Sequence, residues 1–314
     1  MPDGRPSSLT HDALHDALAA PQTPSRPHAF GATDGLLLLM ATIWGVNFSF
    51  VKYATQTLSP TTFTALRLLG AAITMTLVAL VQRNGWPARR DVITLMLLGV
   101  IGNGVYQLFF ANGVSRTRVA DAALIIASAP AAIAIVAQLF GIERLSWRKA
   151  AGIALSIAGV AIVILASATV AHRQGTLVGT LCMVAAVTCW SFFTIGIRGF
   201  TMRMDPVQVN TFALLGGVAS MIVVAPTVAA TPWHTISWKV WGSVLYASAI
   251  SMGIAYLFYM RGLRVLGPTR AAIYGNLQPL VAALVAWGVF GEIPTMWQCV
   301  GGVLIVGGIL LTRW

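Results

Sequence analysis

The sequence predicts an all-α integral membrane protein in which ten transmembrane helices form two five-helix repeats of inverted topology. Three observations predict this fold: an apolar composition, ten apolar runs of bilayer length, and a long pattern that occurs twice. The 314 residues are 57% hydrophobic and only 9% charged, with a mean hydropathy of +0.79. Soluble proteins carry about 25% charged residues. A soluble fold of this length could not bury so much apolar surface, so we expect the bilayer to cover it.

The ten runs are each long enough to cross a bilayer as a helix. They lie at 35–53, 61–82, 91–111, 119–140, 148–169, 176–198, 206–229, 239–260, 268–290 and 296–313. The alternating apolar and polar pattern of an outer-membrane barrel is absent from the sequence. Residues 1–33 are rich in Pro, Ala, His and Asp and lack the basic start and cleavage site of a signal peptide. We expect them to form a disordered cytoplasmic tail.

An internal repeat joins two distant parts of the chain. The stretch from Tyr106 to Trp147 resembles the stretch 256–297, with Pro130 aligned on Pro279. Upstream, Trp44 aligns with Trp190. A repeat of this length outranks any local motif in predicting a fold. It predicts two related units, residues 34–170 and 171–314.

The distribution of basic residues predicts the orientation of the helices. With both termini in the cytoplasm, most Lys and Arg fall on the inner side, and the outer side holds Lys52, Arg116, Arg118, Arg173 and Lys239. The net charge of +11 therefore indicates topology and not nucleic-acid binding. An odd number of spans in each unit makes the second unit enter the membrane from the opposite side. Inverted repeats are typical of secondary transporters, in which two halves move about a central site.

The repeated block also resembles a known family. Its turn, its half-way proline, its Phe-Gly end and its glycine-rich closing helix are similar to the EamA repeat of the drug/metabolite transporter superfamily. The resemblance covers about residues 35–314 and is strongest to YddG-type amino-acid exporters of the bacterial inner membrane. It implies ten helices that arose by duplication of a five-helix unit. Compact multidrug members of the superfamily use a carboxylate in the first span, and residues 35–53 contain none.

Polar and aromatic residues at mid-span are the candidate substrate ligands, because an amide at bilayer depth must face protein or water. They are Trp44, Asn47, Asn103, Tyr106, Gln107, Trp190, Ser191, Tyr256, Asn276 and Gln278. Asn103 and Gln107 are four apart and would share one face of a regular helix. Each amide could instead make an ordinary hydrogen bond between helices.

Four further residues are candidate hinge or gate positions. Pro130 and Pro279 interrupt their spans and could act as hinges or as simple packing kinks. Arg67 lies inside the second span and Asp121 begins the fourth. The two could pair to close the outer face, or Arg67 could extend outward to the membrane surface, the more ordinary role for an arginine near a span end.

A neutral cavity with amides and indoles suits a zwitterion with an apolar side chain. We therefore expect an exporter of small zwitterionic metabolites such as amino acids, including aromatic ones, acting as a monomer or weak homodimer. Carriers of lipophilic cations or of sugar phosphates and nucleotide sugars are the alternatives, and an embedded enzyme is a more distant one. Enzymes of that kind cluster His, Asp, Glu or Cys at one depth, and the five histidines lie in the tail or outer loops. The sequence predicts no cofactor and no metal site.

Overall fold

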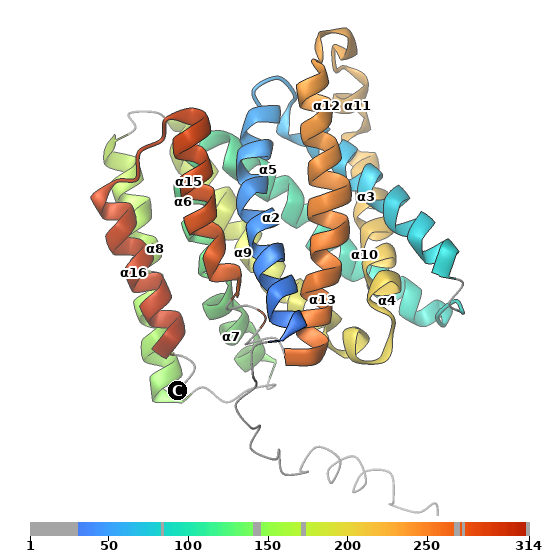
Figure 1. Ribbon diagram of the computed structural model, residues 1–314, viewed down its shortest axis with the longest axis horizontal. Coiled ribbons are helices and arrows are strands. Elements are labelled where there is room, and N and C mark those ends of the chain that lie inside the picture. Colours follow the sequence, from blue (N-terminus) through green and yellow to red (C-terminus); the bar gives the residue numbers. More distant parts are fainter. Residues whose placement is uncertain are drawn as a thin grey trace, which may run out of the picture. The chain divides into compact units, whose positions relative to one another are not determined.

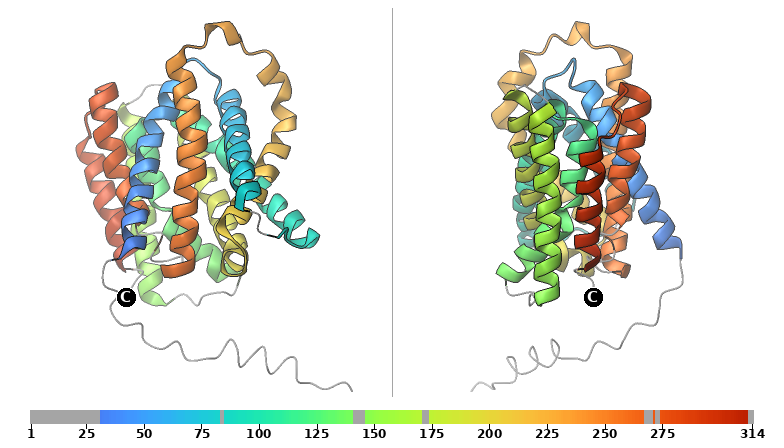
Figure 2. Two further views of the ribbon diagram at one scale, coloured as in Figure 1. Left: turned by 45° about the vertical axis from the view of Figure 1, so that its right-hand side comes forward. Right: turned by 90° about the vertical axis from the view of Figure 1, so that its left-hand side faces the viewer.

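The computed structural model describes residues 31–82, 85–140, 146–170, 174–266, 271 and 274–311. Their regular structure is entirely helical, and none of them lies in a β-strand. Most of the predicted tail and part of the ninth predicted span, residues 268–270 and 272–273, lie outside the described residues. Residues 33–314 form one compact unit of roughly parallel and antiparallel helices (Figures 1 and 2).

Ten helical stretches correspond to the ten predicted spans. The first five are α2 (Ala32–Ala54), α3 (Pro60–Gln82), α4 (Arg89–Gly99) with a π-helical segment (Val100–Val105) and α5 (Tyr106–Arg116), α6 (Val119–Ala127) with α7 (Ala129–Leu139), and α8 (Trp147–Val170). The second five are α9 (Gln174–Arg203), α10 (Pro206–Ser220) with a 3₁₀ turn (Met221–Val224) and α11 (Ala225–Ala229), α12 (Trp238–Leu245) with a π-helical segment (Tyr246–Ile254) and α13 (Ala255–Leu266), a 3₁₀ turn (Gly275–Leu277) with α15 (Gln278–Phe290), and α16 (Met296–Leu311). Over the part of the chain that the structure describes, seven stretches are long and apolar enough to cross a membrane, and the other three hold shorter apolar helices. The all-α membrane fold is confirmed.

Both aligned prolines lie where a helix restarts. α6 ends at Ala127, and α7 begins two residues later with Pro130 in its first turn. Pro279 occupies the same place in α15, directly after the 3₁₀ turn Gly275–Leu277. Proline has no N–H to donate and its ring clashes with the carbonyl one turn earlier, so it is tolerated at a helix start and interrupts a longer helix. The fourth and ninth spans are therefore discontinuous, not merely kinked.

The helices α3 and α10, which correspond in the predicted repeat, run in opposite directions. The side chain of Thr62, at the start of α3, lies 3.0 Å from that of Thr231, just beyond the end of α11. The amide nitrogen of Gln208, at the start of α10, donates to the carbonyl of Gly85, just beyond the end of α3, at 2.7 Å. The stretch from α10 to α11 therefore begins where α3 ends and finishes where α3 begins, and α3 packs directly on α10.

The helices α8 and α16 form a separate pair beside the other helices (Figure 1). Glycines bring their backbones together: a Cβ placed on Gly159 would lie 2.7 Å from the carbonyl oxygen of Gly301, and one on Gly308 would lie 2.4 Å from that of Gly152. Small residues of this kind allow close helix packing in membranes. We call these two helices the glycine pair.

Candidate functional site

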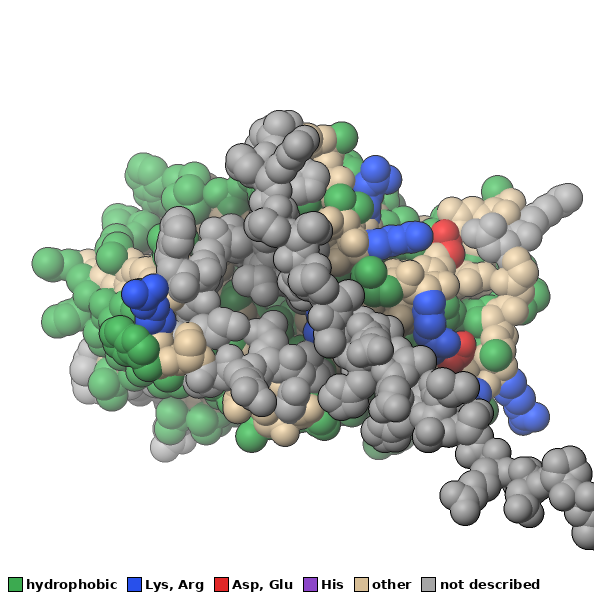
Figure 3. Space-filling view, turned by 90° about the horizontal axis from the view of Figure 1, so that it is seen from below, with side chains coloured by type: hydrophobic (Ala, Val, Ile, Leu, Met, Phe, Trp, Pro, Cys, Tyr) green, Lys and Arg blue, Asp and Glu red, His purple; other side chains and the backbone are tan. Residues whose placement is uncertain are grey.

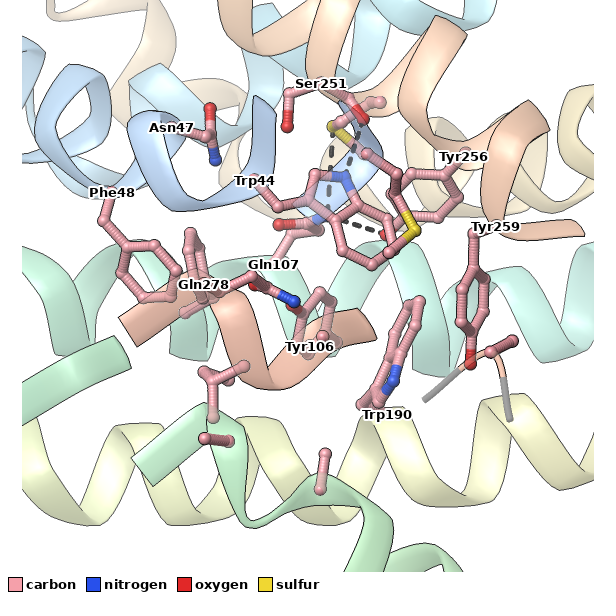
Figure 4. A pocket seen from close by; sticks show the side chains of 18 of the residues that line it. Trp44, Asn47, Phe48, Tyr106, Gln107, Trp190, Ser251, Tyr256, Tyr259 and Gln278 are labelled. Atoms are coloured by element: carbon pink, nitrogen blue, oxygen red, sulfur yellow. Dashed lines mark hydrogen bonds between the residues drawn. The ribbon is translucent and has the colours of Figure 1, made fainter. Parts of the chain in front are cut away.

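A central cavity lies among helices from both halves of the chain. Its open space is about 800 Å³, part of which is continuous with solvent. Both discontinuous spans and both spans with π-helical segments contribute to its wall. The lining residues are Met40, Trp44, Asn47, Phe48, Arg67, Tyr106, Gln107, Phe110, Ile126, Ala127, Ala129, Pro130, Ile133, Trp190, Ser251, Met252, Tyr256, Tyr259, Ala271, Gly275, Asn276 and Gln278 (Figure 4).

Aromatic rings from the two halves meet across this cavity. Trp44 on α2 and Trp190 on α9, the aligned tryptophans, have ring centroids 6.1 Å apart and perpendicular ring planes. Tyr256 lies 5.4 Å from Trp44, and Tyr106 lies 5.3 Å from Trp190. The indole N–H of Trp44 donates to the carbonyl oxygen of Ser251 at 3.0 Å. This bond holds the ring against the π-helical segment Tyr246–Ile254. Edge-to-face rings of this kind form a firm apolar wall on which a planar ligand could stack.

A polar chain of contacts begins at Arg67. Its Nη2 donates to the side-chain oxygen of Gln107 at 2.5 Å, and the guanidinium lies 5.2 Å from the ring centre of Phe63 and 5.4 Å from that of Phe110. The amide nitrogen of Gln107 in turn donates to the hydroxyl of Tyr256 at 3.4 Å. Gln107 therefore links the charge of Arg67 to the aromatic wall.

Three further amides from the predicted set line the cavity, namely Asn47, Asn276 and Gln278. Asn47 and Gln278 are buried, and their side chains extend into the space beside Trp44 and Phe48 (Figure 4). The Oδ1 atoms of Asn47 and Asn276 have no hydrogen-bond partner among the described residues. Buried polar groups are normally paired, so these amides are suited to a ligand or to water.

Two predicted ligands, Asn103 and Ser191, do not line the cavity. Asn103 is fully buried and packs on α10. A Cβ placed on Gly217 of that helix would lie 2.7 Å from the Cβ of Asn103. The face shared by Asn103 and Gln107 is predicted for a regular helix. Asn103 lies within the π-helical segment Val100–Val105, which changes the turn between the two residues. The hydroxyl of Ser191 donates to the Val187 carbonyl of its own helix at 2.8 Å.

Both interpretations of Arg67 as an outer-face residue are wrong. Its side chain is 1% exposed and points into the protein, so it does not extend to the membrane surface. It also makes no ion pair with Asp121, whose carboxylate accepts from the amide of Gln298 at 2.6 Å. The contact with Gln107 and the two phenylalanine rings holds the guanidinium inside. Pro130 lines the cavity, whereas Pro279 only starts the helix that carries Gln278.

The end of the fourth span at which α6 begins is held by a different set of contacts. The Glu292 carboxylate accepts from the backbone N–H of Val119, the first residue of α6, at 2.9 Å. Arg118 donates to the carbonyl of Ile293 at 2.6 Å. A carboxylate at a helix N-terminus satisfies an otherwise unpaired N–H and is favoured by the helix dipole. Contacts between residues this far apart in the sequence could not be read from the charge pattern.

Several lining residues were missed because they are apolar. Phe48 and Phe110 lie four residues after Trp44 and Tyr106, so the helical spacing placed them on the same faces. Nothing in the sequence separates such a lining residue from an ordinary core residue. Among the described residues no group of three or more His, Cys, Asp or Glu could hold a metal ion.

The sequence profile of the EamA-like transporter family matches this chain twice, over residues 32–165 and 177–314. An uncharacterized transporter of Bacillus subtilis, YyaM, is 25% identical over 280 residues, covering 88% of this chain and 91% of that protein. A Streptantibioticus cattleyicolor protein described as a "probable terminal-alkyne amino-acid exporter" is 24% identical over 275 residues, covering 88% and 91%. One solved crystal structure has a TM-score of 0.64 at 18% identity, covers 91% of this chain and 99% of its own, and shows a common fold.

Proposed function

We propose that this chain, which belongs to the EamA-like transporter family, exports small zwitterionic metabolites, in particular amino acids including aromatic ones. Its two five-helix units, residues 34–170 and 171–314, are inverted repeats, and alternating access about the central cavity carries the substrate across the membrane. The protein lies in a bacterial inner membrane with both termini in the cytoplasm.

The observation that carries this proposal is the makeup of the central cavity. Its wall takes residues that are aligned in the predicted repeat, Trp44 and Trp190, and also includes uncharged amides. A cavity shared by two related units can open to either side of the membrane as one unit moves against the other. Aromatic faces and amides suit a substrate that has an apolar side chain and polar ends.

The arrangement of helices and charges supports the inverted topology. α3 and its counterpart α10 run in opposite directions, as the contacts at their two ends require. Exposed arginines gather at the end where α4 begins and where α9 and α13 finish, namely Arg89, Arg90, Arg203, Arg261 and Arg264. Lys and Arg side chains are visible over the face seen from below (Figure 3). An excess of basic residues marks the cytoplasmic side.

The charges in the cavity narrow the class of substrate. Among its described lining residues none is Asp or Glu, and the one basic residue is Arg67. A lipophilic cation would have no counter-charge, and a sugar phosphate would have one cation for its two or more negative charges. The relative described as an amino-acid exporter supports the same class.

The lack of an acidic lining residue also bears on energy coupling. Proton-coupled transporters place Asp, Glu or His where it is reached from both sides, and no described lining residue is of these types. We infer movement driven by the substrate's own gradient. In sealed vesicles with equal substrate on both sides, an imposed pH difference then causes no net accumulation. Uphill accumulation that a protonophore abolishes would overturn this part of the proposal.

A counterflow screen tests the function itself. Vesicles containing the purified protein are loaded with one unlabelled amino acid at a time, and entry of the same labelled compound is followed. We expect transient accumulation for amino acids with aromatic or apolar side chains, and none in vesicles without protein. A screen in which amino acids fail but sugar phosphates or lipophilic cations succeed would replace the proposed substrate class.

A further inference from the structure

We propose that Arg67 anchors the carboxylate of the substrate, and that this site takes apolar or aromatic carboxylates whose amino group is not required for binding. The inference rests on the proposed transport function and deepens it. It assigns one residue to the negative end of the ligand and makes that end the main determinant of recognition.

The burial of Arg67 is the first observation. The side chain lines the cavity yet is 1% exposed, and it forms no ion pair with any described Asp or Glu. Its Nε has no hydrogen-bond partner among the described residues. A buried charge without a partner is strongly unfavourable. The free-energy cost of removing the charge from water is offset only by an opposite charge and by hydrogen bonds. An anion that enters the cavity would supply both.

The contacts of Arg67 hold its guanidinium in place and leave part of it free. Its hydrogen bonds to Gln107 all use Nη2, at 2.5 Å to the side-chain oxygen and 3.4 Å to the backbone carbonyl. The rings of Phe63 and Phe110 at 5.2 and 5.4 Å attract the cation. Nε and Nη1 make no hydrogen bond to the described residues. Their N–H groups, on the two sides of the planar guanidinium, are therefore available to the oxygens of a carboxylate, with which arginine forms strong charge-assisted hydrogen bonds.

The aromatic wall continues from the anchor to the far side of the cavity. Phe110 lies 5.9 Å from Tyr106, and Tyr106 lies 5.3 Å from Trp190, measured between ring centres. Gln107 connects Arg67 to Tyr256 on the other wall. A ligand with its carboxylate at Arg67 would therefore place an apolar or aromatic group directly against the rings.

Among the described lining residues, the ammonium group of a zwitterion has no acidic partner. Besides Arg67 and the tryptophan indoles, the described polar side chains of the wall are neutral amides and hydroxyls, such as Asn47, Ser251 and Asn276. They can accept a hydrogen bond from an ammonium group, but they offer it no counter-charge. The positive charge of Arg67 repels that group. Loss of the amino group should therefore cost little affinity, whereas loss of the carboxylate should cost much.

Three probes that share a phenyl ring test this directly on the unaltered protein. Phenylalanine carries both polar groups, 3-phenylpropionate lacks the amino group, and 2-phenylethylamine lacks the carboxylate. In competition against labelled phenylalanine counterflow, we expect 3-phenylpropionate to compete about as well as phenylalanine, and 2-phenylethylamine to be roughly 30-fold weaker or worse. Equal competition by both analogues, or stronger competition by the amine, would overturn the proposal.

Variants of Arg67 provide the second test, read as the rise in thermal unfolding temperature caused by 3-phenylpropionate. Arg67→Gln should raise the apparent dissociation constant about 30-fold or more, without a lower unfolding temperature in the absence of ligand, because a buried unpaired charge is removed. Arg67→Lys keeps the positive charge but lacks the planar guanidinium, and it should give an intermediate loss of affinity. Ligand stabilisation of Arg67→Gln equal to that of the unaltered protein would overturn the anchor.

The outcomes separate this proposal from the transport function. Amino-acid counterflow that persists unchanged in Arg67→Gln would leave the function standing and remove the carboxylate anchor. If the unaltered protein carries no amino acid, yet is stabilised by 3-phenylpropionate through Arg67, the carboxylate anchor would stand and the proposed amino-acid transport would fall. If neither variant folds, the competition among the three probes on the unaltered protein decides.

Discussion

The central cavity and the glycine pair are opposite solutions to packing helices in a membrane. Around the cavity, bulky rings keep the helices apart, with the centroids of Trp44 and Trp190 at 6.1 Å. In the glycine pair the backbones nearly touch, since a Cβ on Gly159 would lie 2.7 Å from the Gly301 carbonyl oxygen. Close approach excludes a ligand and favours rigidity. None of the described residues of α8 and α16 lines the cavity, so the comparison indicates that this pair supports the structure.

The backbone differs between the two regions in the same way. α8 and α16 are uninterrupted over their described lengths, whereas the cavity wall includes residues of the π-helical segment Tyr246–Ile254 and of both helix restarts at proline. Irregular backbone at membrane depth is tolerated where it is buried in protein or lines a cavity. π-helical turns inside α-helices are frequent at functional sites. Local irregularity therefore coincides with the residues proposed to bind substrate.

The largest expected effect is that of Trp44→Ala on substrate affinity. Removing an indole that stacks on the ligand forfeits about 1.5–3 kcal/mol of apolar burial, which corresponds to roughly a 10- to 100-fold weaker apparent affinity. Gly159→Ala, in the glycine pair, should leave the affinity of the folded protein unchanged. Counterflow measured over a range of substrate concentrations checks both variants. Equal affinity in Trp44→Ala and the unaltered protein would remove Trp44 from the site.

A second contrast lies within α16 and concerns stability. A Cβ on Gly308 would lie 2.4 Å from the Gly152 carbonyl oxygen, whereas one on Gly307 meets its nearest atom, on Leu155, at 3.9 Å. We expect Gly308→Ala to lower the free energy of unfolding by about 1–3 kcal/mol through overpacking. Gly307→Ala should be neutral or slightly stabilising, because alanine favours a helix. Thermal unfolding in detergent compares them, and equal unfolding temperatures would show that the pair is loosely packed.

The sequence predicted the framework of this molecule better than its details. Ten apolar runs and a doubled pattern were sufficient for the membrane fold, and mid-span rings and amides such as Trp44 and Gln107 did reach the cavity. Asn103 did not, because a π-helical segment changes the helical turn and leaves no clear mark in composition. The inward direction of Arg67 depends on Gln107 and Phe110, partners some 40 residues away. Side-chain direction of this kind is set by tertiary packing, which local patterns do not encode.

The smallest expected effect is a pH dependence of stability at the N-terminal end of α6. Burial raises the pKa of Glu292, although the N–H of Val119 and the charges of Lys52 and Arg118 oppose the rise, and Asp121 adds to it. A raised pKa means that the folded state binds more protons than the unfolded one. The resulting stability is present below the ordinary glutamate pKa of about 4.3 and is lost as pH rises through the raised value.

Thermal unfolding between about pH 4 and pH 7 checks this effect against Glu292→Gln, which cannot titrate. We expect the unfolding temperature of the unaltered protein to fall, relative to that of the variant, as the pH increases across this range. A difference that stays constant, or that changes in the opposite direction, would show that Glu292 is not held in the buried contact with Val119.

Alternating exposure of the central cavity is tested most directly by labelling one serine in each region. Ser251 lines the cavity, and Ser156 is fully buried against Gly308 in the glycine pair. Each is changed to cysteine in a protein whose native Cys182, Cys189 and Cys299 are replaced, and a membrane-impermeant maleimide is added to sealed vesicles of either orientation. We predict that Ser251→Cys reacts from both sides, that a transported amino acid slows both reactions, and that Ser156→Cys reacts from neither. Reaction of Ser251→Cys from one side alone in an actively exchanging protein would contradict alternating access.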